Sequence, residues 1–305
     1  MRYRLQRQKS GALAVHNTDY AETMHPGAGP WAEATGLYVQ GSGLAGELCA
    51  PGSTPVVVFD VGLGAAANAL AAIACHAELQ RRGQRPRALH LVSFEADPGG
   101  LEFAIAEAEA LGYPRGHEPL LRELLAAGAL RREPGLRWEL RRGDFPRGIR
   151  EEPERADVIF FDPFSPRANP EMWSLATLEA LYQCRRRAGR TRLVTYSTAF
   201  GARAGLLLAG FFVGEGPALG RQRASTLAAI WLGDLGRPLT PAWLARWRHD
   251  REPWPPLTPP ATHRALRERL LEHPQWAQAD VEAAEPDLRR AGPRRRPPGR
   301  GPRGR

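Results

Sequence analysis

Four acidic residues follow apolar segments, at points where their carboxylates could contact a ligand. The segments VVVF, LHLVSF, LRWELRRG and VIFF are followed by Asp60, Glu95, Asp144 and Asp162. If these segments are parallel strands, their carboxyl ends meet at one edge of a sheet, which is where ligands of open α/β sheets bind. Carboxylates there can accept hydrogen bonds or take up a proton from a reacting group. The four acids together predict one ligand site more strongly than any of them does alone.

The segment DPFSPRANPEMW, which begins at Asp162, would hold its side chains in place before a substrate arrives. Its first two prolines restrict the backbone φ angle on either side of Phe164 and Ser165. We therefore expect Asp162 and Phe164 to be catalytic residues and Ser165 to bind the substrate. Asn169 is expected either to contact the substrate or to cap the helix that Pro170 begins, and the sequence leaves both roles open.

A glycine-containing loop follows the first apolar segment. Gly62 and Gly64 would let the backbone pass close under a ligand, and the helix that follows offers free amide donors at its N-terminus. Nicotinamide and S-adenosylmethionine sites both use such a loop, and Ala67 stands where the dinucleotide fingerprint has its third glycine. The loop therefore predicts a nucleotide cofactor without choosing between the two, and a plain tight turn is the alternative.

Two further acids complete the predicted cofactor site, which also includes Asp60. Glu95 could accept hydrogen bonds from both hydroxyls of a ribose, although Glu95 or Asp97 could instead cap the helix expected after Pro98. Asp144 could accept a hydrogen bond from an adenine amino group, with Phe145 as an apolar wall. A plain turn aspartate is the alternative for Asp144.

Strand-like and helix-like segments alternate from residue 55 onward. The expected strands are 56–60, 89–95, 136–142, 157–162 and 191–197, and the expected helices between them are 67–83, 100–112, 118–128 and 169–187. This alternation predicts a mostly parallel sheet with right-handed crossovers and helices on both faces, which is a Rossmann-like α/β fold.

Two more strand-like runs, FFVGEG and RQRASTLAAIWLG, follow the last expected parallel strand. Separated by a turn rich in glycine and proline, they predict a terminal antiparallel hairpin. Class I S-adenosylmethionine methyltransferases end their sheets in this way, whereas nicotinamide domains usually end on parallel strands. The hairpin therefore favours S-adenosyl-L-methionine as the cofactor.

The composition predicts a globular protein with a basic tail. The chain has 305 residues, 43% of them hydrophobic, and a formal net charge of +9. Eight arginines and no acid lie in the last seventeen residues, so that subtracting them leaves +1 for the rest. We expect an N-terminal segment packed on the core (1–54), a Rossmann-like domain (55–235), a C-terminal extension rich in proline and tryptophan (236–288) and a disordered tail (289–305).

The remaining sequence features predict a soluble, cytoplasmic protein that binds neither membrane nor metal. The three cysteines are far apart and odd in number, and the eight histidines are scattered, so that neither a disulfide framework nor a metal-binding spacing is present. The N-terminus MRYRLQRQKS lacks the apolar core of a signal peptide, and no apolar run approaches the roughly 20 residues of a membrane helix.

Several motifs together resemble the methyltransferase domain of the MnmC-like family, over roughly residues 16 to 232. They are VVFDVGLGAAAN, DPFSPRANPEMW, EATGLYVQGSGL and TYSTAFGARAGLLLAGFFV, and the family element D-x-F-x-P-x-x-N-P-x-M-W is complete. The family's loop resembles ETGFGTGLN, and DVGLGAAAN keeps its two close-approach glycines and its asparagine. The resemblance therefore adds Asn68 to the expected cofactor-binding residues.

The resemblance implies an N-methyltransferase that uses S-adenosyl-L-methionine. The family methylates the 5-aminomethyl group of wobble 2-thiouridine in tRNA, which makes tRNA the implied partner. Bifunctional members also carry a flavin-dependent oxidase domain. No length remains for one after residue 232, so a stand-alone methyltransferase is expected, with a separate oxidase supplying its substrate.

Three alternatives stay open from the sequence. The loop DVGLGAAAN differs from the family's ETGFGTGLN, and the chain outside its tail carries a net charge of only +1. Both features are compatible with a methyltransferase of the same fold that acts on a small-molecule or other amine. A non-catalytic nucleotide-binding module and a nicotinamide enzyme on a related sheet are the others.

Overall fold

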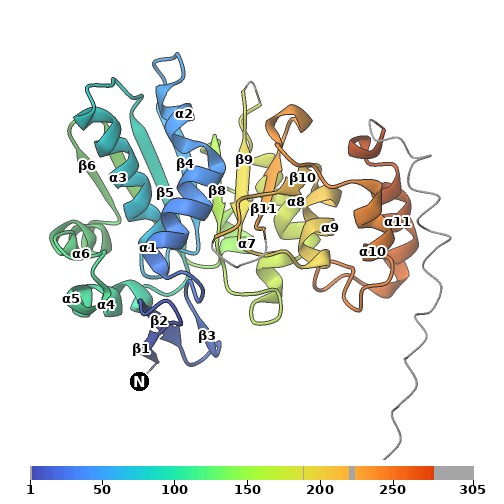
Figure 1. The fold of residues 1–305 in the computed structure, drawn as a ribbon, viewed down its shortest axis with the longest axis horizontal. Coiled ribbons are helices and arrows are strands. Elements are labelled where there is room, and N and C mark those ends of the chain that lie inside the picture. The colour runs from blue at the N-terminus through green and yellow to red at the C-terminus, as the bar shows by residue number, and fades with distance from the viewer. Residues whose placement is uncertain (1, 188, 220–223, 278–305) are drawn as a thin grey trace, which may run out of the picture.

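The computed structural model describes residues 2–187, 189–219 and 224–277, and its centre is an eight-stranded sheet (Figure 1). The strand order is β10-β11-β9-β8-β4-β5-β7-β6. The strands are β4 (Val56–Val61), β5 (Leu89–Glu95), β6 (Ala129–Arg132), β7 (Leu136–Arg142), β8 (Val158–Phe161), β9 (Arg192–Thr195), β10 (Phe212–Glu215) and β11 (Thr226–Ala229).

The centre of the sheet is parallel and its edges are antiparallel. β9, β8, β4, β5 and β7 pair in parallel, whereas β6, β10 and β11 join by antiparallel pairs. All residues of β4 and β8 are buried, as their continuous apolar sequences require in a sheet covered on both faces. The predicted fold class, a mostly parallel sheet with a terminal antiparallel hairpin, is confirmed.

Helices cover both faces of the sheet (Figure 1). One face packs against α1 (Pro30–Glu33), η1 (Ala34–Gln40), α2 (Leu44–Cys49), α3 (Ala67–Arg81), α4 (Gly99–Ala106) and α6 (Glu118–Ala127), with α5 (Ala108–Leu111) after α4. The other face packs against α7 (Phe145–Gly148), α8 (Leu175–Gln183), α9 (Phe200–Ala209), α10 (Pro241–Trp247) and α11 (His263–Leu271). Among the described residues, no helix combines the length and apolar character that crossing a bilayer requires.

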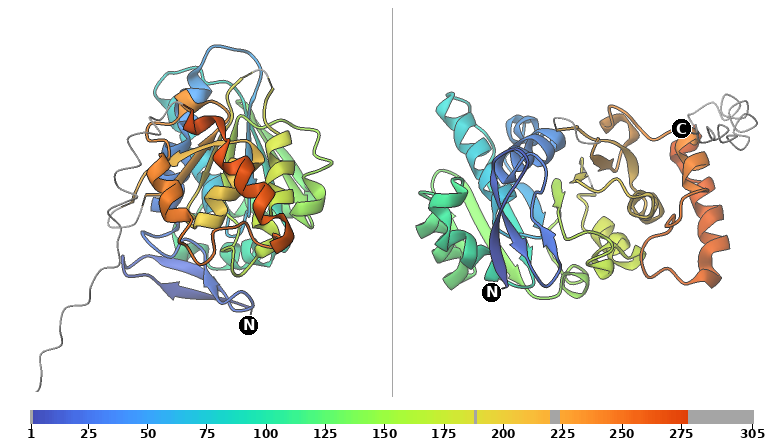
Figure 2. Two further views of the ribbon diagram at one scale, coloured as in Figure 1. Left: turned by 90° about the vertical axis from the view of Figure 1, so that its right-hand side faces the viewer. Right: turned by 60° about the horizontal axis from the view of Figure 1, so that its bottom comes forward.

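A second, small antiparallel sheet precedes the main one and was not expected from the sequence. It consists of β1 (Tyr3–Arg7), β2 (Leu13–Asn17) and β3 (Glu22–Thr23). Figure 2 shows it lying across one end of the main sheet, at the side of the molecule where the N-terminus is. Asn17 and residues 20–26 line the same cavity as the carboxyl ends of β4, β5 and β8, so this sheet forms part of the site.

Two of the expected helices are interrupted. The segment 169–187 was expected as one helix, but it forms a short 3-10 helix, η2 (Pro170–Trp173), before α8 begins at Leu175. Ser174 separates them because its extended backbone and its side-chain oxygen, which accepts the Thr177 amide, cap α8. The segment 100–112 is divided at Glu107 between α4 and α5. Strand β6 was also missed, because only one of its four residues is buried.

The segment after β11 contributes large side chains to the core. Trp243, Trp247 and Trp276 are almost fully buried and belong to the same apolar cluster as Phe59 of β4. The buried Gln275 side chain donates to Val213 and Leu239 carbonyls and accepts the Val213 amide. The predicted domain boundaries stay a prediction, and the arginine-rich tail lies outside the described residues.

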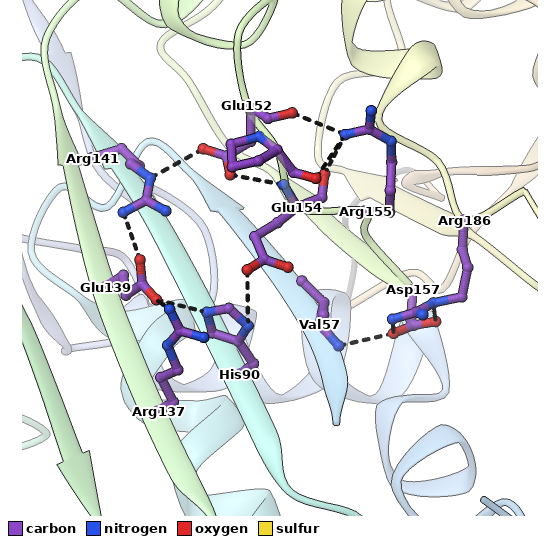
Figure 3. A network of polar contacts seen from close by, with 11 residues as sticks. Val57, His90, Arg137, Glu139, Arg141, Glu152, Glu154, Arg155, Asp157 and Arg186 are labelled. Carbon is purple, nitrogen blue, oxygen red and sulfur yellow. Dashed lines mark hydrogen bonds and ion pairs between the residues drawn. The ribbon is translucent and has the colours of Figure 1, made fainter. Parts of the chain in front are cut away.

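Figure 3 shows a polar network near the starts of β4, β5 and β8. Asp157 accepts the Val57 amide and pairs with Arg186, while His90 contacts Glu139, which also pairs with arginines of β7. These groups satisfy one another at the end of the strands opposite the cavity. We interpret the network as structural.

Candidate active site

A cavity of about 850 Å³ lies at the carboxyl ends of β4, β5 and β8. The chain passes through β5 and β7 before it returns as β8 beside β4, so the cavity lies at the switch point where open α/β sheets bind ligands. The volume is within the roughly 300–1,000 Å³ that small-molecule sites occupy. The predicted residues that line it are Gly62, Gly64, Glu95, Asp144, Phe145, Asp162, Phe164, Ser165 and Asn169.

The glycine loop passes very close to the backbone after β8. Gly62 has a φ of +87°, and a Cβ atom built on it would lie 2.7 Å from the Asp162 carbonyl oxygen. The Gly62 and Leu63 amides both donate to the Phe94 carbonyl at 3.1 Å, and the Gly64 amide donates to Glu95 Oε2 at 2.8 Å. The loop is therefore fixed between the ends of β5 and β8, and no side chain fits at Gly62.

Glu95 lies where the sequence predicted a ribose-binding carboxylate. Its Oε1 accepts the Asp97 amide at 2.9 Å and its Oε2 accepts the Gly64 amide. Burial raises the pKa of Glu95, and these two amides oppose the rise. Each carboxylate oxygen has two lone pairs, so both can still accept a ligand hydroxyl. Glu95 makes no capping bond to α4, whereas Asp97 Oδ1 accepts the Gly99 amide at 3.0 Å where that helix begins.

Asp144 and Phe145 form another part of the cavity wall, after β7. Asp144 is exposed and makes no side-chain capping bond to α7, whereas Phe145 is 6% exposed and packs edge-on against Phe94 at 5.1 Å between ring centroids. Asp144 thus lines the cavity without a capping bond to α7, and Phe145 is fixed beside it.

Asp60 is fully buried beneath the cavity and does not line it. Its Oδ2 accepts the Ser93 hydroxyl at 2.8 Å, and Ser93 accepts the Trp138 indole N–H at 2.9 Å. Its other oxygen, Oδ1, has no hydrogen-bond partner among the described residues. Burial raises the pKa of Asp60 to about 7. Its role as a cofactor-binding residue stays a prediction.

The raised pKa of Asp60 predicts a pH-dependent stability. Because its pKa is near 3.9 when unfolded and about 7 when folded, the folded state loses stability as pH rises from about 4 to about 7. Asp60→Asn cannot ionise. Relative to the wild type, the free energy of unfolding of the variant should therefore increase by roughly 4 kcal/mol when the pH is raised from 4 to 8. Urea unfolding at both pH values measures this, and parallel pH dependences of the two proteins would contradict it.

Asp162 lies at the base of the cavity, with only 14% of its side chain exposed. Asn68, itself buried and not part of the lining, donates its side-chain amide to Asp162 Oδ2 at 2.8 Å. His25 Nε2 lies 3.5 Å from the same oxygen. Burial raises the pKa of Asp162, and the nearby charge of His25 is the strongest opposing effect. Asn68 therefore orients the carboxylate, and its role as a cofactor ligand stays a prediction.

The rest of the DPFSP loop is also held by specific contacts. Phe164 stacks on Tyr20 at 4.4 Å between ring centroids, and its carbonyl accepts the indole N–H of the fully buried Trp173. Ser165 donates through both its amide and its hydroxyl to the Glu22 carboxylate. These contacts, two of them made by the N-terminal residues Tyr20 and Glu22, hold the loop in place beside the cavity.

Asn169 does not cap the helix that follows it. Its side chain makes no capping bond to η2, and it lines the cavity instead. The capping alternative is therefore wrong in this structure, and a substrate contact remains as the predicted role.

The sequence analysis missed the cavity residues that the N-terminal segment contributes. Tyr20, Glu22, His25 and Glu33 all line the cavity, as does Tyr196, whose hydroxyl donates to the Pro163 carbonyl at 3.0 Å. The Glu22–Ser165 contact joins residues 143 positions apart. The turn sequence HPGAG after β3 is the one local signal that the chain folds back there.

The cavity fits S-adenosyl-L-methionine on its own geometry. The glycine loop offers a close backbone approach, Glu95 offers a carboxylate for a ribose, and Asp144 beside Phe145 offers a polar and an apolar contact for a base. Within the described residues, no three His, Cys, Asp or Glu side chains are grouped to hold a metal ion.

Comparison with known proteins matches this chain to methyltransferases. Residues 122–230 match a family described as S-adenosyl-L-methionine-dependent methyltransferases. The tRNA 5-methylaminomethyl-2-thiouridine biosynthesis bifunctional protein MnmC of Paracidovorax citrulli is 33% identical over 237 residues, which are 74% of this chain and 35% of that protein. MnmC of Azoarcus sp. is 32% identical over 234 residues, 73% of this chain and 35% of its own. The chain thus spans about a third of the length of these curated relatives.

Solved structures support the same fold. MnmC2 from Aquifex aeolicus superimposes with a TM-score of 0.67 at 22% identity, covering 89% of this chain and 83% of its own. A spermidine synthase in complex with the transition-state analogue AdoDATO gives a TM-score of 0.52 at 12% identity, with coverage of 88% and 84%. At these identities the likeness concerns the fold alone.

Proposed function

Because this chain belongs to the MnmC-like family of S-adenosyl-L-methionine-dependent methyltransferases, we propose that it methylates the 5-aminomethyl group of wobble 2-thiouridine in tRNA. The observation that carries the proposal is Asp162, a buried carboxylate at the base of the cavity beside the close approach of Gly62. When ionised, this carboxylate would be a proton acceptor beside the expected cofactor loop.

S-adenosyl-L-methionine, when bound, supplies the sulfonium methyl group that an amine nitrogen attacks. The residues proposed to hold it are Gly62, Gly64, Glu95, Asp144 and Phe145, which form a continuous wall of the cavity after β4, β5 and β7. The backbone of the loop would contact the amino acid part, Glu95 the ribose and Asp144 the adenine.

Asp162 is proposed to accept a proton from the substrate amine and to direct the lone pair of the amine nitrogen toward the methyl group. An alkylamine is mostly protonated at neutral pH and has no free lone pair in that form, so a nearby carboxylate is needed. Asn68 and His25 hold this carboxylate in one position, so that little reorientation is needed when the amine arrives.

Phe164 and Tyr20 are proposed to contact the base that carries the amine. Their rings are stacked at the cavity, Tyr20 is 37% exposed, and a nucleobase can stack on such aromatic side chains. Ser165 and Asn169, both in the lining, would then contact the polar edge of the substrate.

The substrate implies partners that we also propose. The names of the relatives refer to biosynthesis of a modified tRNA nucleoside. We therefore propose that this chain binds tRNA and acts in the cytoplasm. A separate oxidase would supply the aminomethyl group.

The experiment uses methyl-labelled S-adenosylmethionine, the full chain, and tRNA from cells that lack this modification step. Label should enter that tRNA, and S-adenosylhomocysteine, but not NADH, should raise the melting temperature of the protein. Label that enters free amines such as polyamines, but not tRNA, would move the substrate to a small molecule and overturn the proposal.

A further inference from the structure

Three ionisable side chains from separate elements meet in the wall of the cavity. His25, in the turn between β3 and α1, has its Nε2 atom 3.5 Å from Asp162 Oδ2 and its Nδ1 atom 3.6 Å from Glu33 Oε2. The exposed fractions of the side chains are 9% for His25, 5% for Glu33 and 14% for Asp162. The imidazole ring thus lies between two largely buried carboxylates.

One group in this cluster, His25, can carry a positive charge between the two carboxylates. Among the described residues, neither Glu33 nor Asp162 pairs with a lysine or an arginine, so His25 is the one group there that can balance them. Burial lowers the pKa of His25, but Asp162 and Glu33 more than offset this and the pKa is raised above 6.5. For Glu33, burial alone would raise the pKa of the carboxyl. Contact with His25 and with two backbone amides outweighs burial, so that the pKa of Glu33 is lowered.

Two further residues act on His25 from η1 and β4. Tyr38 of η1 meets the imidazole edge-to-face at 6.3 Å between ring centroids, and the buried carboxylate of Asp60 in β4 adds to the negative field. The charged and titratable groups that act on His25 are therefore Glu33, Asp162, Asp60 and Tyr38. All but the tyrosine favour the imidazolium.

The backbone at His25 is held in an unfavourable conformation. Its φ is +53°, in the left-handed region that few residues other than glycine adopt. Glu33 Oε1 accepts the amides of Gly27 and Ala28, each at 2.8 Å, and so fixes the turn. Such strain persists where the surrounding structure enforces it, and it is concentrated at functional sites.

We propose that His25, as an imidazolium held between Glu33 and Asp162, is a positioning residue that keeps Asp162 ionised and aimed at the substrate amine. This inference rests on the proposed function. In the reaction, the ammonium proton passes to Asp162 and the amine nitrogen forms its bond to the methyl carbon. The carbon–sulfur bond breaks with its electron pair left on sulfur. A protonated Asp162 could not start this sequence.

The ionisation of His25 can be measured without any turnover. ¹⁵N-histidine NMR of the full chain, with the His25 signal assigned by its loss in His25→Asn, should show a doubly protonated ring at pH 7. In Asp162→Asn, the pKa of His25 should fall. A ring that is neutral at pH 7 in the wild type would overturn the proposal, whether or not tRNA is methylated.

The pH profile of methyl transfer tests the effect on Asp162. His25→Asn suits the backbone because asparagine tolerates positive φ. Without the cation, Asp162 should ionise only at higher pH, so the acidic limb of kcat/KM should move up by roughly one to three pH units. Activity should return toward the wild-type value above that limb. Glu33→Gln should move the limb in the opposite direction or leave it in place, because it leaves the cation paired with Asp162 alone.

His249→Gln is the matched control, because His249 is exposed and lies outside the cavity lining. Its profile should equal that of the wild type. A His25→Asn profile that is lowered equally at all pH values would indicate a merely structural role and overturn the proposal. A wild type that methylates no tRNA would reject the proposed function, while the NMR result would still decide the charge of His25.

Discussion

Asp162→Asn should slow methyl transfer by about 10²–10⁴-fold while leaving S-adenosylhomocysteine binding nearly unchanged. Asparagine keeps the shape of the side chain and can still accept the Asn68 amide through its carbonyl oxygen. It cannot take up a proton from the amine, so the loss should appear in kcat rather than in cofactor affinity.

Single-turnover transfer and calorimetric titration of S-adenosylhomocysteine measure the two quantities separately. Asp250→Asn is a suitable control, because the Asp250 side chain accepts the nearby Glu252 amide and lies outside the cavity lining. A rate for Asp162→Asn equal to that of the control would exclude Asp162 as the proton acceptor. Equal losses of rate and cofactor affinity would instead assign it to cofactor binding.

Gly62→Ala is expected to abolish cofactor binding at millimolar concentrations and to lower the free energy of unfolding by several kcal/mol. The new Cβ atom would lie 2.7 Å from the Asp162 carbonyl oxygen and 3.0 Å from its carbonyl carbon. Because both neighbours are backbone atoms, they can move only if β4 separates from the loop after β8. The positive φ adds a cost of roughly 1 kcal/mol.

Gly83→Ala separates the two effects. Gly83 also has a positive φ, +76°, but a Cβ atom there would meet nothing within 4 Å. This control should lose only about 1 kcal/mol of stability and keep full affinity for S-adenosylhomocysteine. If Gly62→Ala behaved like Gly83→Ala in both measurements, the close approach between the two loops would not be a feature of the protein in solution.

The parallel sheet and most of the cavity wall were predictable from local sequence. β5 and β7 have the bounds that were expected, because continuous apolar or alternating runs determine strands locally. The placement of the acids at the ends of the strands followed from the general rule that the carboxyl ends of parallel strands share an edge. Glu95, Asp144 and Asp162 therefore line one cavity, as predicted.

The other half of the site depends on contacts that local sequence does not encode. β3 is two residues long, and the turn that carries His25 is held by Glu33 and by the packing of η1. A histidine without a nearby partner in the sequence gave no signal. Asp60 is the opposite case: its position at a strand end was right, but its side chain points into the core and bonds Ser93.

We propose that this chain transfers a methyl group to the aminomethyl nitrogen of a tRNA nucleoside, and mass spectrometry of nucleosides tests this directly. The nucleosides are prepared from tRNA of cells that lack this modification step, before and after incubation with the protein and S-adenosylmethionine. We expect that 5-aminomethyl-2-thiouridine disappears and that 5-methylaminomethyl-2-thiouridine appears in equal amount. An unchanged nucleoside profile, from protein shown to bind S-adenosylhomocysteine, would contradict it.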